Sequence, residues 1–333
     1  MKSSPAVRVL GAALGAALLQ IVMITAFAWP SAHLAPRHVP IVVTGPAAGP
    51  VAERLAQARP GAFAITTRPD EAAARKALTD RDAYGAIVTA PSGVRVLTAS
   101  AASPVVAQQL DALAQQFAAP KRDAAANAMP AVRDVVAADP DDPRGTGFGG
   151  MALPLIMSSI AGAALLTFTV RRVAWRAAGV LLFALLGGLG SAALAQSWMS
   201  LLPGPYLAIA GVMAFTIAAV TGTVAGLAAA VGRAGLGVGA LTFLLVGNPL
   251  SAATSAPELL PRPWGEIGQY LPPGASATLL RSAAFFDGAG AARPLTVLAG
   301  WAVLGAVLLA VGAWRARAGR PAGAARAPEP ALT

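Results

Sequence analysis

Six long apolar runs constrain this chain more than any other feature of its sequence. They cover residues 9–29, 149–170, 177–196, 206–231, 234–246 and 294–314, and none of them contains Asp, Glu, Lys, Arg or His. About 20 apolar residues suffice for a helix to cross a bilayer, and a helix satisfies its own backbone hydrogen bonds in lipid. The fifth run is the shortest. We therefore expect an α-helical polytopic membrane protein with six transmembrane helices.

The composition agrees with the membrane class. Hydrophobic residues make up 56% of the 333 residues and charged residues only 12%. The absence of cysteine excludes disulfides and thiolate metal sites. The two histidines, His33 and His38, are too few to form a metal site by themselves. We expect no metal and no cofactor.

The first apolar run follows Lys2 and Arg8 and has two interpretations. Ala26-Phe27-Ala28 resembles the cleavage site of a secretory signal peptide. The apolar stretch is, however, longer than the roughly 7–15 residues of a signal-peptide core. We interpret residues 1–29 as an N-terminal tail with an uncleaved transmembrane helix, and a cleaved signal peptide is the alternative.

Residues 30–148 differ in kind, because they carry 12 Lys and Arg residues and 11 Asp and Glu residues. Short β-branched stretches at 41–43, 64–67, 84–89 and 94–98 predict strands. They alternate with helical patterns at 51–58, 70–78 and 103–117, where Asp70 and Pro104 are typical helix-start residues. Such alternation is typical of a small α/β fold. We expect an α/β domain inserted between the first and second transmembrane helices, with a turn at 139–143 leading back to the membrane.

The distribution of basic residues predicts the orientation in the membrane. With the N-terminus inside, ten basic residues and one acid, Glu329, face the cytoplasm, and the outer side is nearly neutral. Short cytoplasmic loops of membrane proteins are enriched in Lys and Arg. The chain's net charge of +10 therefore needs no nucleic-acid partner. We expect a multi-pass protein of the plasma membrane, in contact with lipid, whose two termini are cytoplasmic. The basic residues counted inside are Lys2, Arg8, Arg171, Arg172, Arg176, Arg233, Arg315, Arg317, Arg320 and Arg326.

The same count assigns the remaining segments. Residues 30–148 and 247–293 lie outside the cell in this topology, and 315–333 form a basic cytoplasmic tail. Residues 149–246 hold the second to fifth transmembrane helices, and 294–314 hold the sixth.

A proline-rich stretch at 247–293 precedes the last apolar run, and we call it the cap. Proline fixes φ and removes a backbone donor, so the cap cannot be one spanning helix. Amphipathic pieces at 264–271 and 276–286 predict short helices across the outer mouth of a helical bundle. A solvated connector is the alternative. Our candidates for an exit lined by the cap are Asn248, Pro249, Pro257, Glu258, Pro261, Trp264, Glu266, Pro272, Pro273, Gly274 and Arg281.

The chain lacks the motifs of a motor or a hydrolase. There is no P-loop, no Gly-x-Ser-x-Gly and no His-Glu-x-x-His. Apolar runs without ionisable residues also argue against an ion-coupled pump. Three Gly-x-x-x-Gly pairs, Gly11–Gly15, Gly222–Gly226 and Gly235–Gly239, favour close helix packing. We expect a non-enzymatic membrane protein whose energy, if it transports, comes from another chain.

Several short segments resemble a known family. They are Gly-Asn-Pro-Leu-Ser at 247–251, Pro-Glu-Leu-Leu-Pro at 257–261, Leu-Pro-Pro-Gly at 271–274 and Leu-Leu-Arg-Ser at 279–282, with Tyr-Gly-Ala-Ile at 84–87 and Ala-Ser-Ala-Ala-Ser-Pro at 99–104. In this order and layout the chain looks like the ABC-2-type transporter permeases of the YhgE/Pip, or phage infection protein, group. The resemblance implies an exporter's membrane subunit that pairs with a separate ATP-binding ATPase subunit, as a homodimer or paired permease.

Under this interpretation one cytoplasmic loop contacts the ATPase. Its candidates are Arg171, Arg172, Trp175 and Arg176, although topology alone also explains these arginines. The alternative function is a non-transporting membrane scaffold, receptor or secretion-accessory protein whose outer domain binds a partner.

Overall fold

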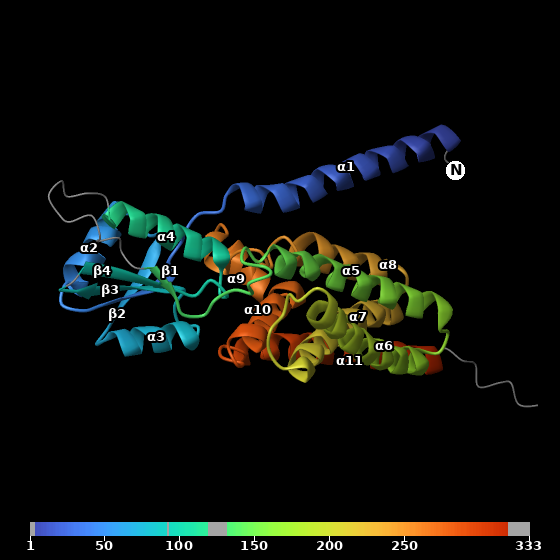
Figure 1. Ribbon diagram of the computed structural model, residues 1–333. Coiled ribbons are helices and arrows are strands. Elements are labelled where there is room, and N and C mark those ends of the chain that lie inside the picture. The colour runs from blue at the N-terminus through green and yellow to red at the C-terminus, as the bar shows by residue number, and fades with distance from the viewer. Residues whose placement is uncertain (1–3, 92, 119–131, 319–333) are drawn as a thin grey trace, which may run out of the picture.

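The computed structural model describes residues 4–91, 93–118 and 132–318, and Figure 1 shows a helical bundle with a small sheet at one end. Lys2, Arg320, Arg326 and Glu329, which entered the charge count, lie outside the described residues. Within the described part, five helices are long and apolar enough to cross a membrane. They are α1 (Pro5–Ala32), α5 (Thr146–Thr169), α6 (Val173–Ala193) continued by the π-helical η1 (Leu194–Trp198), α7 (Tyr206–Val231) and α11 (Ala292–Ala318).

The predicted fifth transmembrane helix differs from the others. It consists of α8 (Ala234–Ala240) and the π-helical η2 (Leu241–Gly247), which together form one shorter apolar helix, Ala234–Gly247. At about 1.5 Å per residue such a helix extends roughly 21 Å, less than the roughly 30 Å of a hydrocarbon core. The described chain thus has five long candidate spans and one short apolar helix where six full spans were expected.

Helix α7 is the centre of the bundle. Its most apolar stretch is 61% buried, against 22% or less for the other four long helices. Its hydroxyl groups bond to the neighbouring helices: Thr221 Oγ1 donates to Ser159 O of α5 at 3.0 Å, and Thr223 Oγ1 donates to Trp301 O of α11 at 2.9 Å. Such bonds fix the rotation of an apolar helix that hydrophobic contacts alone would leave free to turn.

Two of the three predicted Gly-x-x-x-Gly pairs lie where helices cross. A Cβ atom on Gly226 would lie 2.7 Å from Leu308 Cβ and 2.8 Å from Gly305 O of α11. A Cβ atom on Gly235 of α8 would overlap the carbonyl oxygen of Leu227 in α7. The pair in α1 has no neighbour, because nothing lies within 4 Å of a Cβ atom on Gly11.

Helix α1 stands apart from the bundle. No residue of its most apolar stretch is buried, and Figure 1 shows it extending away from the other long helices. Its described contact with the bundle is with η2. The apolar side chains of α1 therefore need lipid or another chain as their environment.

The sheet has the order β2-β1-β3-β4-β5. Strand β1 pairs in parallel with β2 and β3, β3 pairs antiparallel with β4, and β4 pairs in parallel with β5. The four predicted strands are confirmed, whereas the three-residue β5 was not predicted because it is too short to show an alternating pattern. The strands are β1 (Val39–Thr44), β2 (Phe63–Arg68), β3 (Gly85–Ala90), β4 (Gly93–Thr98) and β5 (Val132–Asp134).

Helices cover both faces of the sheet, and the two faces form two cores. Helices α2 (Ala48–Ala58) and α4 (Pro104–Ala118) cover the face that carries Ile41 and Val43. Helix α3 (Glu71–Thr79) covers the opposite face, with Val42. Successive residues of β1 point to opposite faces, as in any strand. We call the sheet and these three helices the sheet unit.

The cap contributes to both cores of the sheet unit. Leu259, which is 0% exposed, packs in the first core, and Phe286 packs in the second. The cap is therefore anchored to the sheet unit by buried side chains, and is not a solvated connector. It contains the single-turn 3₁₀ helix η3 (Pro257–Leu259), α9 (Trp264–Gln269) and α10 (Pro272–Phe285).

Helix α10 is longer and more deeply buried than the amphipathic piece predicted at 276–286. It begins at Pro272-Pro273, where proline's fixed φ suits the first turn of a helix. It packs against α7, α11, α5 and η2. Eleven of its 14 residues are buried, so α10 packs on most of its sides and is not an amphipathic helix with one solvated face.

Candidate functional site

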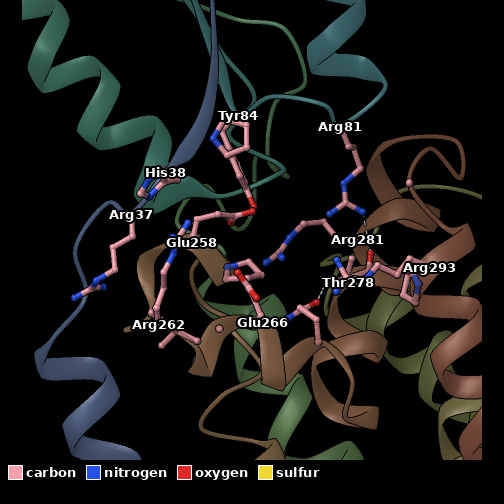
Figure 2. Close-up of a pocket in the computed structure, with 17 residues that line it drawn as sticks. Arg37, His38, Arg81, Tyr84, Glu258, Arg262, Glu266, Thr278, Arg281 and Arg293 are labelled. Carbon is pink, nitrogen blue, oxygen red and sulfur yellow. Dashed lines mark hydrogen bonds between the residues drawn. The ribbon is translucent and has the colours of Figure 1, made fainter. Parts of the chain in front are cut away.

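A cavity of about 540 Å³ lies where the sheet unit meets the cap (Figure 2). Side chains reach it from the segment after α1, from the loop between α3 and β3, from the cap and from the start of α11. Its charged and polar lining residues are Arg37, His38, Arg81, Tyr84, Glu258, Arg262, Glu266, Gln269, Thr278, Arg281 and Arg293.

The lining is strongly positive. Five arginines face two glutamates, which leaves an excess of three positive charges with His38 neutral. Within the described residues, the ion pairs are those of Glu71 with Arg75 and Arg95 and of Lys76 with Asp80. All of these lie on the sheet unit, so no described carboxylate lies within 4.0 Å of a cavity arginine's nitrogen atoms.

Arg281 is the most deeply buried of these arginines, with 6% of its surface exposed. It lies in the middle of α10, and its Nη2 donates to Ala253 O at 2.9 Å. Its guanidinium stacks over the Phe148 ring at 4.6 Å from the ring centre. Burial, with repulsion from Arg81, lowers the pKa of Arg281 to about 10, so that the guanidinium is still charged at neutral pH.

Arg81 approaches the same cavity from the sheet unit. The residue follows α3 with a φ of 65°, which turns the chain so that the side chain points toward the cap. Its Nη1 donates to Thr278 O at 3.0 Å and to Ser282 Oγ, both on α10. Burial lowers the pKa of Arg81 as well. The half-buried guanidinium of Arg81 and the buried one of Arg281 thus reach the same cavity from separate parts of the fold.

A second polar link crosses the cavity. The Tyr84 hydroxyl donates to Glu258 Oε2 at 2.8 Å, and Figure 2 shows the two side chains meeting between the sheet unit and the cap. Burial and the neighbouring Glu258 carboxylate raise the pKa of Tyr84. The hydroxyl therefore stays protonated and keeps its role as the donor.

The segment after α1 closes the remaining side. The backbone N–H of Ala35 donates to Leu259 O at 3.0 Å, and that of Arg37 donates to Glu258 O at 3.0 Å. Arg37 Nη1 also donates to Leu259 O at 2.7 Å. These bonds hold the chain between α1 and β1 against the cap and place Arg37 at the cavity wall.

Four of the predicted exit residues line the cavity: Pro257, Glu258, Glu266 and Arg281. The other predicted cap residues do not line it. Pro272, Pro273 and Gly274 are buried at the start of α10, whereas Trp264 is 40% exposed on α9. Asn248, Pro249 and Pro261 lie at intermediate exposure elsewhere in the cap.

Sequence reasoning missed the residues that come from outside the cap or that looked like isolated charges. Arg81 and Arg37 belong to short connections whose position depends on the tertiary fold, and Arg262 and Arg293 flank helix starts. Tyr84 was noted as the start of the predicted strand 84–89 and within a short resemblance. The basic side chains were the available signal, and the charge count placed them on a nearly neutral outer side.

The predicted cytoplasmic loop lies at the other end of the bundle. It joins α5 to α6, and Arg176 Nε donates to Val170 O at 2.6 Å. Two contacts mark the same end: Arg233 lies over the Phe168 ring at 5.2 Å, and Arg315 Nη1 donates to Ala230 O at 2.7 Å. Basic residues of two connections and of the last turn of α11 therefore gather at one end, opposite the sheet unit. Arg171, Arg172 and Trp175 are exposed there.

The cavity does not have the chemistry of a metal site. Among the described residues, no three His, Asp or Glu side chains gather as metal ligands would. The arrangement instead presents guanidinium donors to a space large enough for a small ligand. Comparison of the chain with family models, with curated proteins and with solved structures finds no match.

Proposed function

We propose that this chain is the membrane-spanning permease subunit of an ABC-2-type exporter, energised by a separate ATPase subunit. The observation that carries the proposal is that α10 links the sheet unit to the centre of the bundle. Arg81 of the sheet unit donates to Thr278 O on α10. Ser276, two residues earlier on α10, accepts from Thr216 of α7 at 2.9 Å. A displacement of α7 would therefore reach the sheet unit through one helix.

The short helix Ala234–Gly247 completes an even number of crossings in this proposal. It starts beside Arg233, at the end of the bundle that carries the basic loops. It ends at Gly247, where an added Cβ atom would lie 2.9 Å from Pro273 of the cap. In this proposal the short helix is the sixth crossing, and α10, which packs against its η2 segment, continues the structure past Gly247. With six crossings, both termini lie on the basic, cytoplasmic side and the sheet unit lies outside the cell.

An apolar pocket between helices of the bundle, open to the surface beside the exposed Leu194 and Met199, supports a transport role. It has a volume of about 500 Å³ and lies between α5, the end of α6, α7 and α10. Its wall includes Met151, Leu155, Leu194, Met213 and Leu280. Flexible methionine side chains adapt to differently shaped apolar surfaces. An apolar or amphiphilic substrate would find a suitable surface directly beneath the cap.

The basic loop between α5 and α6 is the contact for the ATPase subunit in this proposal. Trp175 is 66% exposed beside Arg171 and Arg172, and its indole lies at the end of the bundle. An exposed tryptophan next to arginines is typical of the residues that dominate protein interfaces. Because a membrane interface also attracts tryptophan, the experiment below changes the neighbouring arginines and leaves Trp175 in place.

The test is affinity purification of the full-length protein from its own cells in mild detergent. We expect an ATPase subunit to co-purify with the wild type. Charge reversal by Arg171→Glu with Arg172→Glu should abolish co-purification. The matched control, Arg54→Glu with Arg59→Glu on α2 of the sheet unit, should retain it. Absence of any ATPase subunit from the wild-type preparation would contradict the permease proposal and favour the scaffold or receptor alternative.

A further inference from the structure

We infer that the arginine-lined cavity between the sheet unit and the cap binds a phosphate-bearing anion. The inference goes beyond the permease proposal and does not depend on it. Its starting point is the half-buried Arg81 and the buried Arg281, which face one cavity from two parts of the fold. Moving a charge out of water is costly unless a partner of opposite charge replaces the water.

The protein itself supplies too little negative charge for these arginines. Glu258 is the nearest acidic group to interact with Arg81, but its carboxylate accepts from Tyr84 and forms no ion pair with a cavity arginine among the described residues. Glu266 lies at the exposed rim. The two carboxylates offset part of the charge, and the remaining three positive charges match an anion with more than one negative charge.

The guanidinium groups keep donors for such an anion. A guanidinium has five N–H donors. The described bonds occupy Nη1 of Arg81, at Thr278 and Ser282, and Nη2 of Arg281, at Ala253. These bonds fix both side chains before any ligand arrives, which lowers the entropy cost of binding. A fixed, planar guanidinium fork suits the paired oxygen atoms of a phosphate group.

Two of the five cavity arginines lie at its rim. Arg262 and Arg293 are both exposed, and Figure 2 shows them on either side of the opening. Arg293 lies over the Tyr270 ring at 5.0 Å. A volume of about 540 Å³ accommodates a pyrophosphate or a phosphorylated headgroup. The ligand chemistry is therefore a phosphate group, carried either by a soluble molecule or by a lipid headgroup of the adjacent membrane surface.

Calorimetric titration with inorganic pyrophosphate tests the soluble source. The full-length protein is purified in an uncharged detergent, and we expect saturable binding at one site per chain. Arg262→Gln with Arg293→Gln removes two exposed rim charges and leaves Arg81 and Arg281 in place, so it should fold normally. It should weaken binding roughly tenfold or more, since each lost charge-assisted contact is expected to weaken affinity severalfold. Arg81→Gln should weaken it further.

The control removes the same charge elsewhere. Arg54→Gln with Arg59→Gln neutralises two exposed arginines, on α2 and at its C-cap, outside the cavity. We expect this variant to bind pyrophosphate within about twofold of the wild type, because long-range effects of exposed charges are screened by salt. Melting temperatures of both double variants show whether either is misfolded.

Quantification of phospholipid that co-purifies with the protein tests the lipid source. Retention by the wild type and the α2 control, with loss in the rim variant, would identify a lipid headgroup as the ligand, whether or not pyrophosphate also binds. The inference is overturned if neither pyrophosphate nor phospholipid binds the wild type. It is equally overturned if the rim variant and the α2 control bind alike. None of these measurements involves the ATPase subunit, so their outcome is separate from that of the permease proposal.

Discussion

The hydrogen bond between Tyr84 and Glu258 offers the sharpest test of how the sheet unit and the cap hold together. Tyr84→Phe removes one hydroxyl and leaves the ring in place. The lost bond is 2.8 Å long and ends on a carboxylate. Hydrogen bonds to charged groups contribute about 1.5–3 kcal/mol. The equilibrium for separating the two parts should therefore shift by roughly 10- to 150-fold toward the open form.

Two backbone amides report that opening directly. The N–H groups of Ala35 and Arg37 donate to Leu259 O and Glu258 O, across the same boundary. Hydrogen–deuterium exchange at these amides follows the open population when closing is fast. We expect their exchange in Tyr84→Phe to accelerate by the factor above, while the β1–β3 ladder, within the sheet unit, exchanges as in the wild type.

The matched control is Tyr206→Phe. Its hydroxyl donates to Leu189 O at 3.0 Å, within the bundle and far from the boundary. This variant should leave exchange at Ala35 and Arg37 unchanged. Equal exchange in Tyr84→Phe and the wild type would refute the argument, because the bond would then not contribute to holding the two parts together.

Three further predictions follow from packing, topology and titration. Gly268→Ala should destabilise the cap by about 1–3 kcal/mol or more, because its Cβ atom would overlap Leu250 O. In the same thermal melt Gly211→Ala should be neutral or stabilising, because the Cβ atom there would lie in open space. A membrane-impermeant thiol reagent should label Ala56→Cys on exposed α2 in intact cells and spare Ala316→Cys, and the reverse pattern would contradict the proposed orientation. Hydrogen bonding to Arg75, with a smaller effect of Arg95, holds the pKa of Glu71 below its ordinary value of 4.5. The stability that this carboxylate contributes is present above pH 4.5 and is lost as the pH falls through the lowered pKa. Glu71→Gln should therefore make the melting temperature less sensitive to acid.

Local sequence patterns determined the secondary structure well. The four strands and the three helices of the sheet unit were predicted because each alternating or helical pattern is complete within one short segment. The long apolar helices were predictable for the same reason, and α7 begins and ends at the predicted residues, Tyr206 and Val231. Hydrophobic length and period are local properties, and the bilayer and the helix both depend on them.

The sequence was less informative about α10. The prolines of the cap excluded one spanning helix, and Pro272 and Pro273 begin α10. Whether that helix lies on the surface or inside depends on its neighbours. Gly274 and Gly268 approach so closely that a Cβ atom on Gly274 would overlap Gly268 O, and this approach allows α10 to turn into the bundle. No local pattern distinguishes a glycine needed for close packing from the many other glycines of this chain.

The arginine-lined cavity was decided by tertiary structure alone. Arg81 and Arg281 are 200 positions apart in the chain, and Arg37 comes from a third segment. Each of the three arginines is an ordinary basic residue in its own segment. From the sequence alone only the abundance of basic residues could be predicted. The pairing of β1 with β3 and the insertion of α10 bring the three segments to one place. The segments that were assigned to the outer side are nearly neutral in sum, yet the cavity between them is positive, because packing and not sequence order decides which residues meet.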